Sequence, residues 1–270
     1  MTMRSARIAG ADAHAAAPTT RGRYLYCIVE AADGLELAPS GVGDEANSVY
    51  AVHHGGFAAV VSATPHLRHH PSRENLLAHE RVVEAVMQEH TVIPMSFGTI
   101  LPDDADVVAL LRGAASALTE ALNAVRGRIE LGLNAVWDRD RVLSDLEAEH
   151  EPIRTLKDSI TRERNGSSYF PRVQLGQLVE QALETRANEL MWGVYEPLRP
   201  LSVSSRAGKL IGDDMLLNVA FLVDRAREDE FNHAVQRLAA RYEHLLSFKY
   251  TGPWPPYSFV HLRLELEHTD

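Results

Sequence analysis

Residues 79–99 read HERVVEAVMQEHTVIPMSFGT and decide how the first half of the chain folds. The early part places apolar residues at helical spacing, whereas the late part is β-prone. The pattern predicts an amphipathic helix from Ser72 to about His90, followed by an extended segment over Thr91–Leu101. A helix with one apolar stripe must cover a sheet or another helix, so the neighbouring segments determine the fold class.

The segments around this helix predict strands before it and a further helix after it. Arg23–Glu30 is apolar on both alternating faces, as in a central strand. Two short β-prone runs are joined through Gly55-Gly56, which predicts a hairpin. The predicted elements are the strands Arg23–Glu30, Val49–His54 and Phe57–Ala63 and the helix Asp103–Val125. Residues 23–126 are therefore predicted to form an N-terminal α+β domain, a sandwich related to the second half.

The second half has the order β-α-β-β-α-β with one more strand at the end. That order is typical of a ferredoxin-like split βαβ unit, so residues 127–270 are predicted to form a C-terminal ferredoxin-like α+β domain. The predicted strands are 129–137, 198–204, 215–223, 245–250 and 260–266, and the predicted helices are 139–164, 171–196 and 224–242.

Composition excludes several classes of protein. The 270 residues are 45% hydrophobic and 24% charged, which is typical of a globular protein with a substantial core. The net charge of −10 argues against nucleic acid or an anionic membrane as a partner. No apolar run approaches the ~18 residues of a membrane-spanning helix. Residues 1–22 predict a flexible tail without a signal peptide, and the lone Cys27 in an apolar run fits a reducing cytoplasm.

The His79-Glu80 pair at the start of the quoted stretch resembles the zinc motif of metalloproteases. That motif needs a second histidine four residues after the first, and this position is Val83. His90 is eleven residues further along, about 16 Å away on a helix, so the two histidines cannot share a metal ion. His79 and Glu80 are therefore expected to be buried or half-buried and hydrogen-bonded, with Glu80 tethering the neighbouring backbone.

No other motif assembles an active site. Histidines gather at 53–54 and 66–70, but no carboxylate or cysteine is fixed beside them at metal-ligand spacing. A nucleophile elbow is absent from the sequence. We expect no catalytic residues, no metal and no cofactor.

Thr251–Val260, TGPWPPYSFV, contains three prolines within four residues. Proline donates no hydrogen bond, so this segment cannot be an internal strand and is predicted to be a stiff extended connector. It would hold Trp254 and Tyr257 at fixed positions. They would either cover the core of the second domain or form an aromatic contact patch.

Four segments in order over residues 23–266 resemble the gas vesicle protein F/L family, accessory proteins of gas vesicle formation. They are RYLYCIVEA, HERVVEAVMQEHTVIPMSFGTIL, MLLNVAFLV and TGPWPPYSFV. One difference is Ser96, where the family pattern has a basic residue before Phe-Gly-Thr. The resemblance implies a non-enzymatic protein, in the cytoplasm or at the gas vesicle. It would bind the hydrophobic major shell protein, and possibly other accessory proteins, and assist or nucleate shell assembly.

In this interpretation a small set of residues forms a structural joint or a partner contact: His79, Glu80, Val83, Phe97, Gly98, Trp254, Pro255 and Tyr257. Two alternatives stay open. One is a cofactor- or small-ligand-binding protein of the paired ferredoxin-like type, holding haem or a metal through a histidine. The other is a hydrolase, which would need a deep pocket joining Glu80 to another titrating group.

Overall fold

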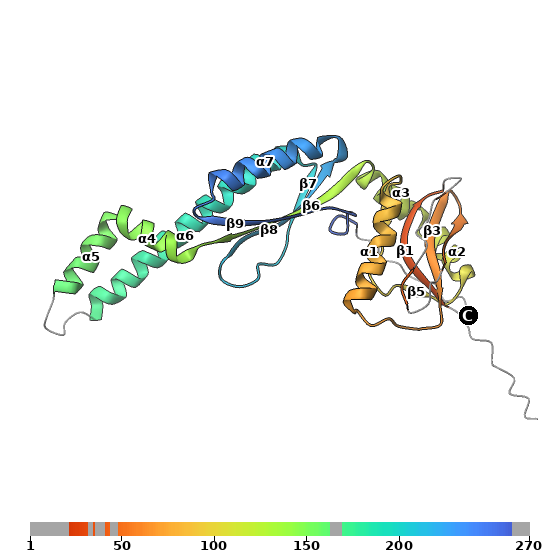
Figure 1. Ribbon diagram of the computed structural model, residues 1–270, viewed down its shortest axis with the longest axis horizontal. Helices are drawn as coiled ribbons and strands as arrows, with labels where there is room; N and C mark the ends of the chain where they lie inside the picture. The colour runs from red at the N-terminus through yellow and green to blue at the C-terminus, as the bar shows by residue number, and fades with distance from the viewer. Residues whose placement is uncertain (1–21, 32–34, 36–40, 44–47, 163–168, 261–270) are drawn as a thin grey trace, which may run out of the picture.

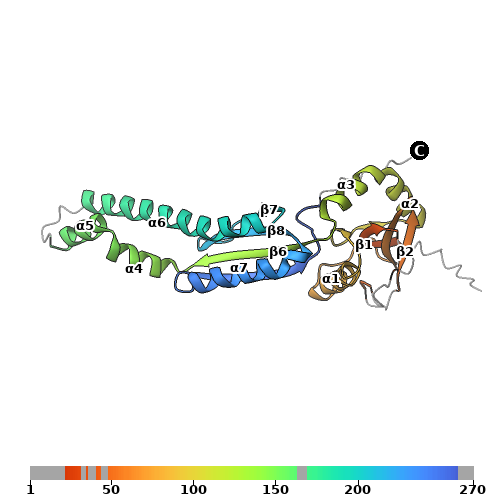
Figure 2. The same ribbon diagram turned by 90° about the horizontal axis from the view of Figure 1, so that it is seen from above.

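The computed structural model describes residues 22–31, 35, 41–43, 48–162 and 169–260. The molecule is elongated, with one sheet at one end, a second sheet in the middle and a group of helices projecting at the far end (Figures 1 and 2). Strands and helices are mixed, and every strand pair is antiparallel. The predicted α+β class is confirmed at this level.

The first sheet contains five strands in the order β2-β3-β1-β4, and β5 also pairs with β1. Its elements are β1 (Gly22–Glu30), β2 (Val49–His54), β3 (Phe57–Thr64), α1 (Arg73–Met87), β4 (Val92–Pro94), β5 (Ile100–Leu101), α2 (Asp104–Gly113) and α3 (Ala115–Val125). The glycine pair 55–56 makes the β2–β3 hairpin, with positive φ at both positions.

Helices cover both faces of this sheet. On one face, α1 packs Val82, Val83 and Val86 against strand residues that include Tyr24 and Tyr26. On the other face, α2 and α3 supply a second apolar core, which contains Val107, Leu111, Leu118 and Leu122 together with Leu25 and Ile28. β1 lies between these two cores, which explains why its sequence is apolar on both alternating faces.

The second sheet has four strands in the order β7-β8-β6-β9. Its elements are β6 (Arg128–Trp137), α4 (Arg139–Glu149), α5 (Glu151–Arg162), α6 (Tyr169–Leu198), the 3-10 turn Arg199–Leu201, β7 (Ser204–Ala207), β8 (Met215–Asp224), the 3-10 turn Arg225–Arg227, α7 (Glu228–Arg241) and β9 (Leu246–Trp254). Helices α6 and α7 lie side by side on one face of this sheet (Figures 1 and 2).

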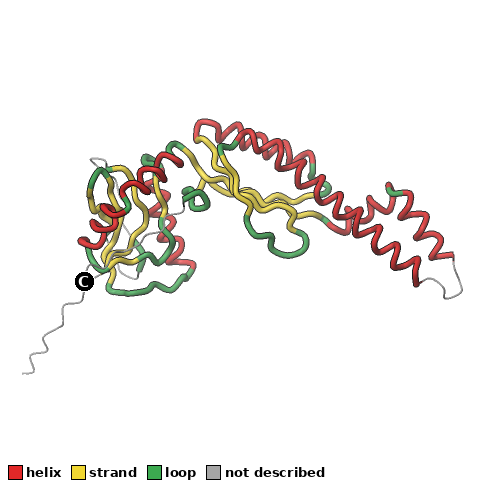
Figure 3. Tube along the Cα trace, turned by 180° about the vertical axis from the view of Figure 1, so that it is seen from behind, coloured by secondary structure: helices red, strands yellow, loops and turns green. Residues whose placement is uncertain are grey.

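The core of the second half follows the strand alternation. Ile129, Leu131, Leu133, Ala135 and Trp137 of β6 all point into it, as their spacing predicts. The thirty residues of α6 span about 45 Å, so the helix continues far beyond the sheet. Its free half packs with α4 and α5 into the projecting helical group seen in Figure 3.

Several predicted boundaries were wrong. Helix α1 ends at Met87 rather than near His90, because the chain must turn to pair Ile93 with Ile28 in the sheet. The single helix predicted for 139–164 is two helices separated at His150. Pro152 explains that break, because its ring would clash with the carbonyl of Ala148 if the first helix continued. The helix predicted for 103–125 is likewise interrupted at Ala114.

The proline-rich segment needs a correction as well. Thr251–Trp254 belongs to β9, and Trp254 is paired with Glu130. β9 is an edge strand, so Pro253, which has no N–H to donate, can lie in it without removing a hydrogen bond from a neighbouring strand. Beyond Trp254 the chain is not extended as predicted but turns, with the Tyr257 N–H donating to the Pro255 carbonyl and the Phe259 N–H to the Pro256 carbonyl. The predicted tail, apart from Gly22 in β1, and all of the predicted terminal strand beyond Val260 lie outside the described residues.

Replacing a core phenylalanine of the second half should destabilise the protein strongly. Phe221 is 0% exposed in β8, and its removal leaves a cavity. Phe221→Ala is expected to lower the free energy of unfolding by about 3–5 kcal/mol in urea denaturation. Phe170→Ala is the matched control, because Phe170 is 80% exposed and its loss should change that free energy by less than about 0.5 kcal/mol. Equal effects of the two variants would contradict the placement of this core.

Candidate functional site

His79 is a buried polar residue on the inner face of α1 and is 3% exposed. The imidazole stacks on the Tyr26 ring at 5.6 Å between centroids and meets the rings of Tyr24 and Phe97 edge-on at 5.7 and 5.9 Å. The helical spacing that places Val82, Val83 and Val86 on the sheet also brings His79 onto it. The side chain therefore lies in an aromatic environment between helix and sheet.

Hydrogen bonds fix the protonation of this histidine. The Gly98 N–H donates to the Tyr24 hydroxyl at 3.0 Å, and that hydroxyl lies 3.1 Å from His79 Nδ1. On the other side, His79 Nε2 lies 3.1 Å from the Met95 carbonyl oxygen. A carbonyl only accepts, so Nε2 carries the proton and Nδ1 accepts from Tyr24. Both ring nitrogens are satisfied in the neutral form.

Burial favours the neutral form of this imidazole. It lowers the pKa of His79 to about 4, an effect that the hydrogen bond to Met95 only partly opposes. Burial also raises the pKa values of the Tyr24 and Tyr26 hydroxyls. The cluster is therefore uncharged near neutral pH, as a polar group in an apolar core should be.

The segment Pro255–Val260, here called the junction segment, crosses from the second sheet to the first half of the molecule. The Tyr257 hydroxyl lies 3.2 Å from His79 Nε2. The Ser258 N–H and hydroxyl both donate to the Glu130 carboxylate at 2.7 Å. Val260 packs against the core beneath α2 and α3. The junction segment thus connects the two halves through side chains of α1 and β6.

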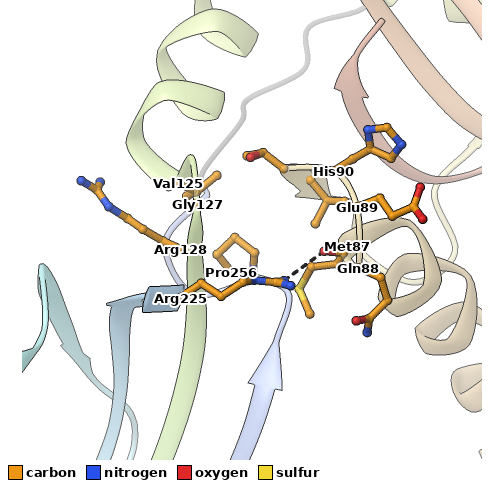
Figure 4. Close-up of a pocket in the computed structure, with 11 residues that line it drawn as sticks. Met87, Gln88, Glu89, His90, Val125, Gly127, Arg128, Arg225 and Pro256 are labelled. Atoms are coloured by element: carbon orange, nitrogen blue, oxygen red, sulfur yellow. Dashed lines mark hydrogen bonds between the residues drawn. The ribbon is translucent and has the colours of Figure 1, made fainter. Parts of the chain in front are cut away.

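A second contact between the halves lies at the end of α1. Arg225 donates to the Met87 carbonyl at 3.0 Å, occupying one of the free carbonyls that end a helix (Figure 4). Around it is a cavity of about 200 Å³, whose lining includes His90, Gly127, Arg128 and Pro256. Arg128 is already engaged, because it donates to Asp224 and to the Ala124 carbonyl. This cavity therefore lies between the two halves, beside an existing tether.

The structure brings most of the predicted site residues together. Tyr257 bonds His79, Phe97 contacts the same ring, and Gly98 reaches it through Tyr24. Gly98 has φ +85°, a conformation that favours glycine and aims its N–H at the Tyr24 hydroxyl. Val83 is different: it is fully buried in the α1 core, so it cannot be a partner contact.

The predicted tether by Glu80 was wrong. Within the described part of the chain the Glu80 carboxylate has no hydrogen bond; it lines a small cavity of about 110 Å³ instead. The other lining residues are Glu84, Trp254, Pro255 and Tyr257. Helix geometry explains the difference: His79 occupies the centre of the buried stripe, whereas Glu80 lies on its margin and meets the junction segment.

The structure bears differently on the two alternatives: no metal cluster is found among the described residues, whereas a small cavity does join Glu80 to the titrating residues Glu84 and Tyr257. Within the described ranges no three His, Cys, Asp or Glu side chains gather closely enough to hold a metal ion. His69 of the histidine-rich loop lies 2.9 Å from the Thr64 hydroxyl and edge-on to Tyr24, which gives it a packing role. The cavity beside Glu80 contains no serine, cysteine or lysine side chain that could act as a nucleophile. In addition, no described helix is long and apolar enough to cross a membrane.

Sequence reasoning missed residues that complete the junction. Tyr24 links Gly98 to His79, and the Met95 carbonyl determines that the His79 proton is on Nε2. Glu130 accepts hydrogen bonds from Ser258. The tyrosines in RYLYCIV offered a signal, because a buried tyrosine hydroxyl needs a partner. Glu130 was a second signal in the sequence, because its carboxylate stands between buried residues of β6 and also needs a partner. Its pKa is raised, chiefly by burial.

Comparison with known proteins gives the chain a family. Residues 22–261 match the family model described as "Gas vesicle synthesis protein GvpL/GvpF". The chain belongs to this GvpL/GvpF family. The resemblance seen in the four sequence segments is thereby confirmed.

Relatives and a solved structure agree with this assignment. Gas vesicle protein F of a Streptomyces species is 33% identical over 239 residues, covering 88% of this chain and 98% of the relative. Gas vesicle protein F1 of Halobacterium salinarum is 30% identical over 251 residues, covering 92% and 97%. The crystal structure of GvpF from Anabaena sp. has a TM-score of 0.79 at 25% identity, covering 90% of this chain and 99% of that one.

The neutral histidine predicts a specific pH dependence of stability. Its pKa is about 4 in the folded chain and near 6.5 in the unfolded one, so the unfolded state binds more protons between these values. The free energy of unfolding should therefore fall as the pH drops from 6.5 to 4, by about 3 kcal/mol from this residue alone. Urea denaturation of the wild type and of His79→Gln across this range measures the difference.

The control for this experiment is His70→Gln, because His70 is exposed and its variant should keep the wild-type pH dependence. If His79→Gln also retained the full wild-type slope, the neutral buried state of His79 would be refuted.

Removing one hydroxyl tests the bond across the junction. Tyr257→Phe keeps the ring but loses the contact with His79, whose Nε2–H still has Met95. The free energy of unfolding should decrease by about 0.5–1.5 kcal/mol, the net contribution of one hydrogen bond. Tyr169→Phe, at a 73% exposed position, should change nothing measurable. A Tyr257→Phe variant as stable as wild type would show that the hydroxyl contributes nothing to the junction.

Proposed function

We propose that this protein is a non-enzymatic accessory factor of gas vesicle formation that binds the hydrophobic major shell protein and assists or nucleates shell assembly. The observation that carries this proposal is the family match over residues 22–261, a range that includes every described residue. Family membership supports a role in gas vesicle formation. The proposal goes further than family membership. It names the shell protein as a partner, other accessory proteins as further partners, and a location in the cytoplasm or at the vesicle.

A physical argument supports the choice of partner. An apolar, β-rich shell subunit exposes strand edges that aggregate before assembly. Here the strands β2 and β7 lie at the ends of their sheets, where a further strand can pair. Near β7, the apolar side chains of Val203, Leu210 and Ile211 are 47%, 50% and 73% exposed. The net charge of −10 would keep a complex with the shell subunit dispersed.

The proposal includes two domains divided at residues 126 and 127, both with ferredoxin-like character. Two separate sheets and the strand orders β2-β3-β1-β4 and β7-β8-β6-β9 support it, because in each the order along the chain is 2-3-1-4. The second half also has a helix in each crossover, α6 and α7. In the first half α1 lies between β3 and β4, and the residues described between β1 and β2 include no helix.

We assign the residues around His79 the role of a structural joint. His79, Phe97, Gly98 and Tyr257 would fix the angle between the halves, and Trp254 and Pro255 would support them from the end of β9. The support is the set of hydrogen bonds from one imidazole on α1 to Tyr24 of the first sheet, to the Met95 carbonyl and to Tyr257 of the junction segment. The cofactor-binding alternative is not favoured by the relatives.

Capture from vesicle-forming cells tests the main proposal. A tagged full-length chain should co-purify with the major shell protein, because it offers that subunit a pairing edge. A tagged unrelated protein of similar size and charge is the control. In vitro, the chain should also reduce light scattering when shell protein is diluted from denaturant. Failure to capture any gas vesicle protein would refute the proposal. A visible absorbance band or stoichiometric metal in the purified chain would favour the cofactor alternative.

A further inference from the structure

The cavity lined by Glu80, Glu84, Trp254, Pro255 and Tyr257, here called the acid–aromatic pocket, has an unbalanced charge. Glu80 and Glu84 are four residues apart on α1, so their carboxylates lie on the same face of the helix. Among the described residues neither carboxylate forms an ion pair. Burial, and then the charge of Glu80, raise the pKa of Glu84. Two like charges held together in a half-buried place destabilise the empty pocket, and a cation would relieve this.

The remaining walls favour an organic cation over a metal ion. Trp254 and Tyr257 supply aromatic rings, and Pro255 supplies a buried apolar surface. Calcium ions need about six to eight oxygen ligands, and magnesium ions about six, whereas this pocket offers two carboxylates and apolar surface. Aromatic rings attract organic cations through the negative face of the π system. The chemistry of the lining therefore selects a cation that has both charge and apolar surface.

Size and shape narrow the choice further. The volume of about 110 Å³ is well below the roughly 300–1,000 Å³ of pockets for small-molecule ligands, and suits the end of a single side chain. A guanidinium group is planar, stacks on aromatic rings and can donate to two carboxylates at once. An ammonium group is a compact, strongly hydrated charge and gains less from such walls.

We propose that the acid–aromatic pocket binds the guanidinium group of an arginine side chain presented by a partner polypeptide. The pocket is formed by α1 of the first half together with the end of β9 and the junction segment. An arginine bound there touches both halves and stabilises their present arrangement. The proposal is independent of which protein carries the arginine, so it can fail while capture of the shell protein succeeds, and the reverse.

Titration of the full-length chain with N-acetyl-arginine amide tests the proposal. The assigned indole N–H signal of Trp254 in an NMR spectrum of the ¹⁵N-labelled protein should shift saturably, with a dissociation constant on the order of millimolar for so small a probe. N-acetyl-citrulline amide, which has the same shape without the charge, should leave the signal in place. N-acetyl-lysine amide should bind several-fold more weakly.

Variants assign the binding to the two carboxylates. Glu80→Gln combined with Glu84→Gln should weaken arginine binding about tenfold or more. The double variant should melt at the wild-type temperature or above, because it removes a like-charge pair four residues apart. Glu120→Gln on the exposed side of α3 is the control and should bind like wild type. Equal shifts with the citrulline probe, tighter binding of the lysine probe, or undiminished arginine binding by the folded double variant would each overturn the proposal.

Discussion

The joint proposed between the two halves rests on one constraint: a histidine buried between a helix and a sheet must stay neutral and bonded at both ring nitrogens. In this chain the bonds of His79 come from a strand, from the loop before β5 and from the junction segment, which are far apart in sequence. Satisfying the imidazole therefore links α1, the first sheet and the end of the second sheet. The hydrogen bonds that this one side chain makes therefore connect the two halves.

The two sheets share a strand order but are covered differently, and this accounts for the shape of the molecule. Helices lie on both faces of the first sheet, whereas α6 and α7 lie on one face of the second (Figure 1). The long α6 continues past its sheet and, with α4 and α5, forms the projecting end. In the described sheets β2, β4, β7 and β9 are edge strands, and the elongated molecule has a long exposed surface for its size. These features suit a protein of the GvpL/GvpF family, whose proposed task is adhesion to other proteins.

The hydrophobic pattern of the sequence predicted a strand or helix correctly where the direction of each side chain depends on that element alone. The alternation of β6, the doubly apolar β1 and the glycine hairpin all specified strands that the structure contains, because side-chain direction in a strand repeats every two residues. The helix Arg73–Met87 was predicted from its apolar spacing, and the absence of a zinc motif followed from Val83 at the position four residues after His79. The pattern did not locate helix ends at Met87 and Glu149, since these depend on where the next strand pairs and on a proline beyond the end.

The sequence by itself determined the α+β class, the family and the presence of His79 in a buried stripe, because periodicity, composition and motif order are properties of the chain. Only the tertiary structure decided which groups bond that histidine, that Glu80 faces a cavity instead of a backbone partner, and that β9 continues to Trp254 at a sheet edge. The physical reason is that hydrogen bonds and ion pairs act over about 3 Å in space. Residues 79, 95 and 257 come within that reach only after both sheets have formed.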